Sequence, residues 1–282
     1  MTSVVLAMAL GAIGSSPQPA DTVVQIRAGD RVVVQNLVGR ISVGTWERQE
    51  MEVRTDVGGS GVVVRRSGST VRISPDESKG RRRSVDAAIR LPASVDLEVN
   101  GTSLDVTIEG VEGRIDVDNV SGNAWIENVA GPVSIRTIEG EIHVTRARGG
   151  VTASSQSDDV TLRDVRGPVD VHSGDGDLTL SDIVSTSVRA ETQDGDIDFT
   201  GAILDDGVYG FFVHDGDATV AIPEGTNARV AVSTFDGEFE SDFPVVLDRF
   251  TGGREFDFSV GEPRARIEIQ VFDGEIRLTR RR

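Results

Sequence analysis

The feature that most constrains this chain is a glycine that recurs every nine residues between Gly113 and Gly176. The members of the series are Gly113, Gly122, Gly131, Gly140, Gly149, Gly167 and Gly176, with Asp158 in the place between Gly149 and Gly167. A fixed period dictates architecture more firmly than local propensities do. A unit of this length has room for one short strand and one turn.

Apolar residues occupy the second and the fourth position after each member of this series. They are Ile115, Val117, Ala124, Ile126, Val133, Ile135, Ile142, Val144, Val151, Ala153, Val160, Leu162, Val169, Val171, Leu178 and Leu180. The residue between the two is usually polar, as at Asp116, Ser134 and Thr152. Alternation with a period of two predicts strands that bury one face and expose the other. A third apolar residue often precedes the glycine, as at Val129 and Ile138.

Equal spacing favours stacked coils over a meander of hairpins. A meander has no reason to repeat its turn chemistry on a strict period, whereas a solenoid stacks each coil on an equivalent one. The residue after the glycine alternates in type from unit to unit, so the true coil contains two units. We therefore predict an all-β fold, a single-stranded β-helix-like β-solenoid with two strands per coil of about 18–21 residues.

The chain divides by regularity rather than by linkers. We expect a signal peptide at 1–20 and a single solenoid domain at 21–282, made of a less regular part at 21–110, regular repeats at 111–240, an insertion or cap at 241–265 and the last coil at 266–282. Residues 4–14 form an uncharged apolar run that is too short to cross a bilayer, which is typical of a signal peptide. No Lys or Arg precedes this run. No other segment is predicted to span a membrane.

Charge and cysteine content limit the classes of partner and of site that this chain can have. The net charge of −17 disfavours nucleic acid and anionic membranes. The absence of cysteine excludes disulfides, thiolate metal sites and a cysteine nucleophile. No cofactor is expected, apart from the calcium alternative below.

An acidic ladder is the most suggestive candidate site. Stacking of the coils would align Glu141, Asp159, Asp177, Asp196, Asp217 and Glu238, each directly after a glycine-equivalent position. Neighbouring carboxylates would be about 4.8 Å apart and would repel one another. Ca²⁺ would neutralise such a ladder, because it favours carboxylate and carbonyl oxygens. Two interpretations that need no metal stay open as well: Asp beside Gly is favoured in turns, and like charges discourage aggregation of strand-rich proteins.

Catalysis has little support in the sequence. The histidines His143, His172 and His214 do not fall in one column of the repeat, and no nucleophile elbow, zinc motif or phosphate loop is present. We expect a protein that is not an enzyme.

Four stretches resemble a bacterial β-strand-repeat family of unknown function that is catalogued as "putative adhesin". They begin with Asn36–Trp46, followed by Ile89–Pro92, the Asp-Gly-Asp units such as Gln193–Phe199, and Val220–Pro223 with Thr234–Phe239. The resemblance implies a β-solenoid, a location in the envelope or on the surface, and adhesion.

The expected function is therefore binding. We expect an exported scaffold in the periplasm, on the cell surface or secreted, with a protein or a surface glycan of the envelope as its partner. The alternatives are a structural solenoid that assembles end to end and a calcium-binding repeat protein.

Overall fold

The structure, a computed structural model, describes residues 22–27, 29–55, 61–76, 84–245, 247–250 and 255–281. These residues form strands and turns and contain no helix, so the all-β prediction is confirmed, and none of them belongs to a helix that could cross a membrane. The expected signal peptide lies outside the described residues.

The strands fall into three groups along the chain. The N-terminal group is β1 (Thr22–Gln25), β2 (Arg31–Trp46), β3 (Glu50–Thr55), β4 (Val62–Ser67), β5 (Thr70–Pro75), β6 (Val85–Pro92) and β7 (Asp96–Glu109). The central group is β8 (Ile115–Asp118), β9 (Ala124–Val129), β10 (Val133–Arg136), β11 (Ile142–Ala147), β12 (Val151–Ser155), β13 (Val160–Val165), β14 (Val169–Ser173), β15 (Leu178–Asp194), β16 (Ile197–Asp215) and β17 (Ala218–Pro223). The C-terminal group is β18 (Ala228–Asp236), β19 (Phe239–Ser241), β20 (Leu247–Phe250), β21 (Glu255–Val260), β22 (Ala265–Asp273) and β23 (Ile276–Arg281).

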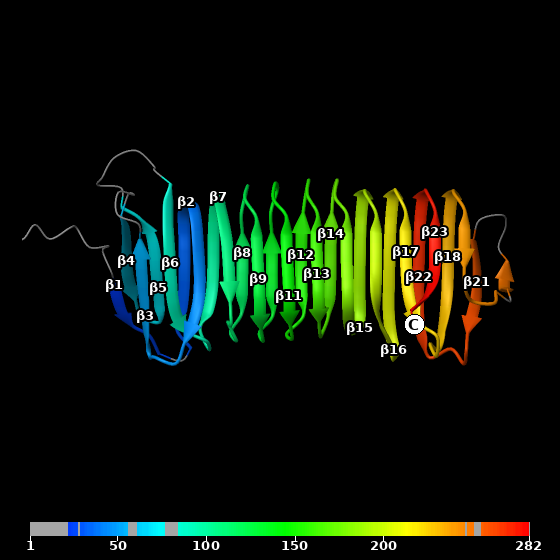
Figure 1. Cartoon of the computed structure of the whole chain (residues 1–282), viewed down its shortest axis with the longest axis horizontal. Helices are drawn as coiled ribbons and strands as arrows, with labels where there is room; N and C mark the ends of the chain where they lie inside the picture. The colour runs from blue at the N-terminus through cyan, green and yellow to red at the C-terminus, as the bar shows by residue number, and fades with distance from the viewer. Residues whose placement is uncertain are drawn as a thin grey trace, which may run out of the picture.

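The central strands form two parallel columns in a solenoid-like stack (Figure 1). The first column contains β8, β10, β12 and β14, which continue into the second halves of β15 and β16. The second column contains β9, β11 and β13, which continue into the first halves of β15 and β16. Val133 pairs with Val151, and Val151 pairs with Val169, so equivalent residues lie directly above one another. We call the two strands and two turns between equivalent positions a coil.

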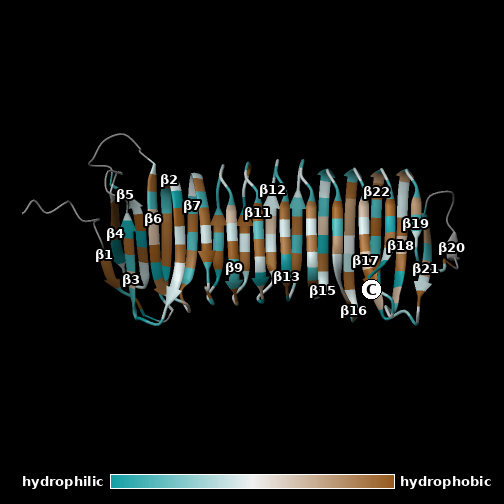
Figure 2. Cartoon of the chain, in the orientation of Figure 1, coloured by the Kyte–Doolittle hydropathy of each residue, from teal (hydrophilic) through white to brown (hydrophobic). Residues whose placement is uncertain are grey.

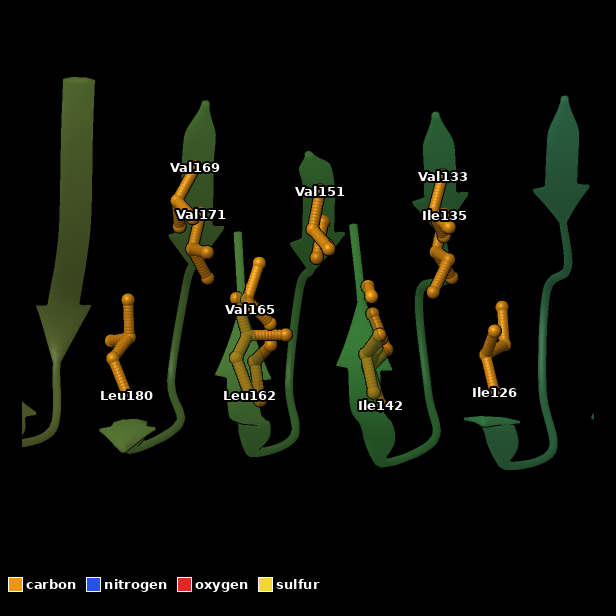
Figure 3. Close-up of a cluster of buried hydrophobic side chains, with 14 of the residues drawn as sticks. Ile126, Val133, Ile135, Ile142, Val151, Leu162, Val165, Val169, Val171 and Leu180 are labelled. Carbon is orange, nitrogen blue, oxygen red and sulfur yellow. The ribbon is translucent and has the colours of Figure 1, made fainter. Parts of the chain in front are cut away.

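The core is the space between the two columns. All sixteen apolar positions of the repeat are buried, which confirms the predicted alternation. Their side chains pile up along the stack in Figure 3, and Figure 2 shows the matching alternation of hydrophobic and hydrophilic residues. Each fully buried Val, Ile or Leu contributes roughly 1.5–3 kcal/mol, so the columns of aliphatic side chains are the main source of stability.

The recurring glycine is required because coils meet backbone to backbone at the turns. A Cβ atom at Gly131 would lie only 2.1 Å from the carbonyl oxygen of Gly113 in the preceding coil. At Gly140 a Cβ atom would meet the Gly122 carbonyl oxygen at 2.2 Å, and the φ angle of +138° also favours glycine.

The two edges of the stack use different turns. At one edge Asn128 takes a left-handed conformation with a φ angle of 56°, which shifts the strand alternation by one residue and buries Val129. At the other edge the alternation continues unshifted, so Thr137 points inward and Ile138 is 45% exposed. The third apolar position of the repeat is therefore core at one edge and surface at the other.

Both ends depart from the order of the sequence. At the N-terminal end β2 lies between β5 and β7, because Val32 pairs with Val71 on one side and Leu97 on the other. At the C-terminal end β22 lies between β16 and β18, and β23 lies between β17 and β19. Figure 1 shows β22 and β23 in red, inserted between the yellow β17 and the orange β18. The coil predicted as the last one is thus last in the sequence but not in the stack.

Antiparallel strands follow the parallel stack at each end. β1, β3 and β6 pair antiparallel in the second column, and β4 pairs antiparallel with β5 in the first. At the other end β21 pairs antiparallel with both β18 and β20. Phe258 is fully buried there and lies near Phe239 and Phe256. The segment expected as an insertion or cap therefore covers the end of the first column.

Candidate functional site: a groove along one edge of the stack

The predicted acidic ladder exists, but backbone amides already bind its carboxylates. The amide of Asp177 donates to Asp159 Oδ1 at 2.9 Å, and the amide of Asp196 donates to Asp177 Oδ1 at 2.9 Å. The amide of Asp217 donates to Asp196 Oδ1 at 2.8 Å. Each carboxylate thus accepts a hydrogen bond from the next coil.

The order of this ladder differs from the prediction at its C-terminal end. Because β23 is inserted, Glu275 follows Asp217, and its amide donates to Asp217 Oδ1 at 2.8 Å. Glu238 comes after Glu275, beyond the inserted coil. Arg277 donates to both Asp217 and Glu275, so a cation from this chain lies at this point of the ladder. At the other end, the amide of Glu141 donates to Asn123 rather than to an acid.

No group of three or more His, Cys, Asp or Glu side chains within the described ranges is placed to hold a metal ion. The calcium hypothesis for Glu141, Asp159, Asp177, Asp196, Asp217 and Glu238 stays a prediction. The structure adds that four of these six backbone amides donate to the side chain of the preceding coil.

His143 lies on the second column of the stack, whereas His172 and His214 lie on the first. His143 is on the outer face of β11, where its Nε2 lies 2.9 Å from Glu141 Oε2 and its ring stacks on Trp125. His172 is on β14 of the first column, and His214 is near the end of β16. His172 and His214 belong to different coils of this column.

A different feature emerges at the edge of the stack where Ile138 is exposed. A hollow of about 540 Å³ runs beside this edge from Asp118 to Gln193. A second hollow of about 430 Å³ begins at Gln193 and continues to Phe235. Since both hollows share Gln193, we describe them together as the edge groove, which runs along the stack across β8, β10, β12, β14, β15, β16, β22 and β18.

Buried polar side chains fix the turns beneath the groove. Thr137 Oγ1 donates to the carbonyl of Glu139, Ser173 Oγ to that of Asp158, and Thr192 Oγ1 to that of Gly176. These residues occupy the same inward position in their coils. Their hydrogen bonds hold each turn in one conformation, so the groove is built on a rigid edge.

An aromatic column lines the C-terminal half of the groove. His214, Phe272 and Phe235 stand in successive coils, and the rings of His214 and Phe272 are 4.8 Å apart. The rings of Phe272 and Phe235 are also 4.8 Å apart and nearly parallel, at 3°. Phe235 is 59% exposed and Phe272 47% exposed. Nearby, the Arg189 guanidinium lies over the ring of Phe212 at 4.5 Å.

Two ion pairs lie in the groove, which is also lined by the carboxylate of Asp175. Arg189 donates to Glu191 at 2.6 Å, and Arg136 lies 3.8 Å from Asp118. The remaining polar lining includes uncharged amides and hydroxyls, such as Gln156, Gln193 and Ser154.

The sequence contains a signal for this groove that the repeat analysis missed. Residues two positions before the glycine of this edge are Val120, Ile138, Gln156, Gly174, Gln193, His214, Phe235 and Phe272. The insertion of β22 then places Phe272 between His214 and Phe235. The repeated position two residues before the glycine can be found in the sequence, but the order of His214, Phe272 and Phe235 along the stack cannot.

Part of the chain is similar to a known protein family. Residues 151–279 match the family described as Toastrack DUF4097. The match confirms the predicted resemblance, and the matched residues include the aromatic column and most of the acidic ladder. No curated protein matches the sequence of the chain.

Two solved structures are similar to the chain over most of its length. One, from Bacteroides fragilis, is described as a "putative adhesin"; it has 14% sequence identity and a TM-score of 0.42, over 93% of this chain and 98% of that chain. The other, from Clostridium sporogenes, is described as a "putative cell adhesion protein"; it has 9% identity and a TM-score of 0.26, over 94% of this chain and 100% of that chain.

Proposed function

We propose that this protein is an exported β-solenoid, with two strands per coil, that acts as a non-catalytic binding module of the cell envelope. The observation that carries the proposal is the edge groove, which extends over many coils and exposes an aromatic column. An extended groove suits a long partner that makes many similar contacts, and exposed aromatic groups are common anchors of binding surfaces. The partner class is an envelope protein or a surface glycan.

Export and the lack of catalysis rest on the sequence together with the site. The apolar run at 4–14 suits an exported protein. The backbone hydrogen bonds of the acidic ladder and the placement of His143 on the column away from the groove favour binding over acid–base chemistry. End-to-end self-assembly stays a prediction, and the antiparallel strands at each end of the stack disfavour it.

The experiment measures co-sedimentation of the purified chain with bacterial envelope fractions. A double variant, Phe235→Ala with Phe272→Ala, removes the exposed rings of the aromatic column. Trp125→Ala is the matched control, because Trp125 is 39% exposed but lies on the second column, away from the groove.

We expect the double variant to bind envelope material about tenfold more weakly, since each lost aromatic contact costs about 0.5–1.5 kcal/mol. The control should bind as the unmodified chain does. Equal binding by all three proteins, or an absence of binding by the unmodified chain, would contradict the proposal. Fractionation of cells that express the full chain tests export, and retention in the cytoplasm would refute it.

A further inference from the structure

The chemistry of the edge groove indicates which class of partner it takes. Resting on the proposed function, we infer that the groove binds an uncharged linear polysaccharide that lies along the axis of the stack. Three properties of the groove lead to this ligand: its aromatic column, the pairing of its charges and its shape.

The aromatic column offers an exposed apolar strip to sugar rings. Because its rings stack on one another, it presents their edges and the offset parts of their faces, against which the C–H groups of a pyranose ring can pack. His214, Phe272 and Phe235 belong to three successive coils and line the groove together. A saccharide chain that crosses these coils would contact the aromatic groups in turn.

The polar lining favours hydroxyl groups over charged groups. Both arginines of the groove have acidic neighbours, since Arg189 is paired with Glu191 and Arg136 lies 3.8 Å from Asp118, and the further acid Asp175 adds negative charge. Gln156, Gln193 and Gln270 supply amides that both donate and accept hydrogen bonds. Sugar hydroxyls match such groups. A polyanion is disfavoured by the net charge of −17.

An extended peptide is a weaker candidate for this groove. Peptides that bind to sheets commonly add a strand at a free edge. The strands beneath the groove have no such edge, because β10 pairs with β8 and β12, and β22 pairs with β16 and β18. A peptide would depend on side-chain contacts alone.

The shape of the groove makes a prediction about ligand length. Eight strands cross beneath it, and strands are about 4.8 Å apart, so the groove extends over roughly 35–40 Å. The affinity of a linear oligosaccharide should therefore rise with each added sugar and level off once the chain spans the groove. A pocket for one terminal sugar would show no such dependence.

The test is isothermal titration calorimetry of the full chain with neutral gluco-, manno-, xylo- and galacto-oligosaccharides of increasing length. A polyuronate and a lysine-rich peptide serve as the charged probes. The proteins are the unmodified chain, the Phe235→Ala/Phe272→Ala double variant, a Gln193→Ala variant, and Trp125→Ala as the control. Circular dichroism melts check that every variant is folded, which is expected because the replaced side chains are exposed.

We expect at least one neutral series to bind with affinity that rises with length. The double variant should lose about tenfold in affinity, Gln193→Ala should lose less, and Trp125→Ala should match the unmodified chain. Binding of the peptide or the polyuronate alone, or binding unaffected by the double variant, would overturn the inference. If envelope binding depends on Phe235 and Phe272 while no neutral oligosaccharide binds, the inference fails and the proposed function stands. If envelope binding is also unaffected, both fail.

Discussion

The middle of the stack and its C-terminal end use the same strand chemistry in a different chain order. In the middle, each residue pairs with the one 18 positions later, as Val133 does with Val151. At the C-terminal end, Asp215 pairs with Asp273, which is 58 positions later, and Asp273 in turn pairs with Asp236. The two regions bury similar aliphatic side chains, so they differ mainly in how far apart in the sequence their contacts lie.

This difference predicts a difference in folding. Loop-closure entropy grows with the separation of contacting residues, and contacts of long sequence separation slow folding. The central coils can stack in the order in which they are made. The C-terminal end cannot be completed until β22 and β23 occupy the space between the preceding coil and β18. The aromatic column is complete only when this has happened, because Phe272 belongs to β22.

Removal of residues 262–282, which include β22 and β23, should have the largest effect on the difference between the middle and the C-terminal end. Ile267, Ile269 and Ile276 are fully buried, and each such residue contributes roughly 1.5–3 kcal/mol. We expect β18–β21 to lose their protection from hydrogen exchange while β8–β14 keep theirs. Hydrogen exchange followed by mass spectrometry measures both regions in one sample.

The opposite result would also be informative. The strand sequences Ala228–Asp236 and Ala265–Asp273 align residue by residue and both end in Phe-Asp. If β18–β21 remain protected in the truncated chain, β18 has taken the place of β22 on β16. The C-terminal end would then be stable without the inserted coil, and its long-range contacts would not distinguish its folding from that of the middle.

A glycine substitution tests the tight contact between central coils. Gly131→Ala would place a Cβ atom 2.1 Å from the Gly113 carbonyl oxygen, so the backbones must separate. We expect a loss of about 3 kcal/mol in the free energy of unfolding, measured by denaturant titration. Gly225→Ala is the control, because a Cβ atom there meets no atom within 4 Å. Equal stability of the two variants would show that the repeating glycine is not required by packing.

The sequence predicts the middle far better than the ends, for a physical reason. The repeat period predicts contacts between coils that follow one another in the sequence. Spacing alone therefore predicts that Val169 lies directly above Val151. The repeat pattern does not reveal where β22 lies in the stack, because the strand that carries Phe272 fits the pattern of any coil. For the same reason the groove escaped prediction: Ile138 and Val129 occupy similar positions before a glycine, and only the left-handed Asn128 sends one inward and leaves the other exposed.

A smaller effect is expected from Asp198, where the stack lengthens. Burial raises the pKa of this carboxyl, and the nearby Asp196 and Asp177 carboxylates raise it further. A carboxyl whose folded pKa is raised destabilises the fold once the pH exceeds its unfolded pKa, and the cost disappears under more acidic conditions. Asp198→Asn should therefore raise the melting temperature at pH 7 by about 1 °C, with no difference at low pH. Asp170→Asn is the control, since Asp170 lies in register with Arg189 rather than with an acid. An unchanged or lowered melting temperature for Asp198→Asn at pH 7 would show that the crowded acids carry no cost.

The smallest effect is expected from calcium, and it tests a feature that the middle and the C-terminal end share. The acidic ladder runs through both regions, and Asp159, Asp177 and Asp196 each accept a backbone amide from the next coil. These amides offset the repulsion along the ladder without a metal ion. We therefore expect millimolar Ca²⁺ to leave the melting temperature of chelator-treated protein unchanged, and calorimetry to detect no binding. A raised melting temperature that is lost in an Asp177→Asn variant would instead establish the ladder as a calcium site, since a ligand that binds only the folded state stabilises it.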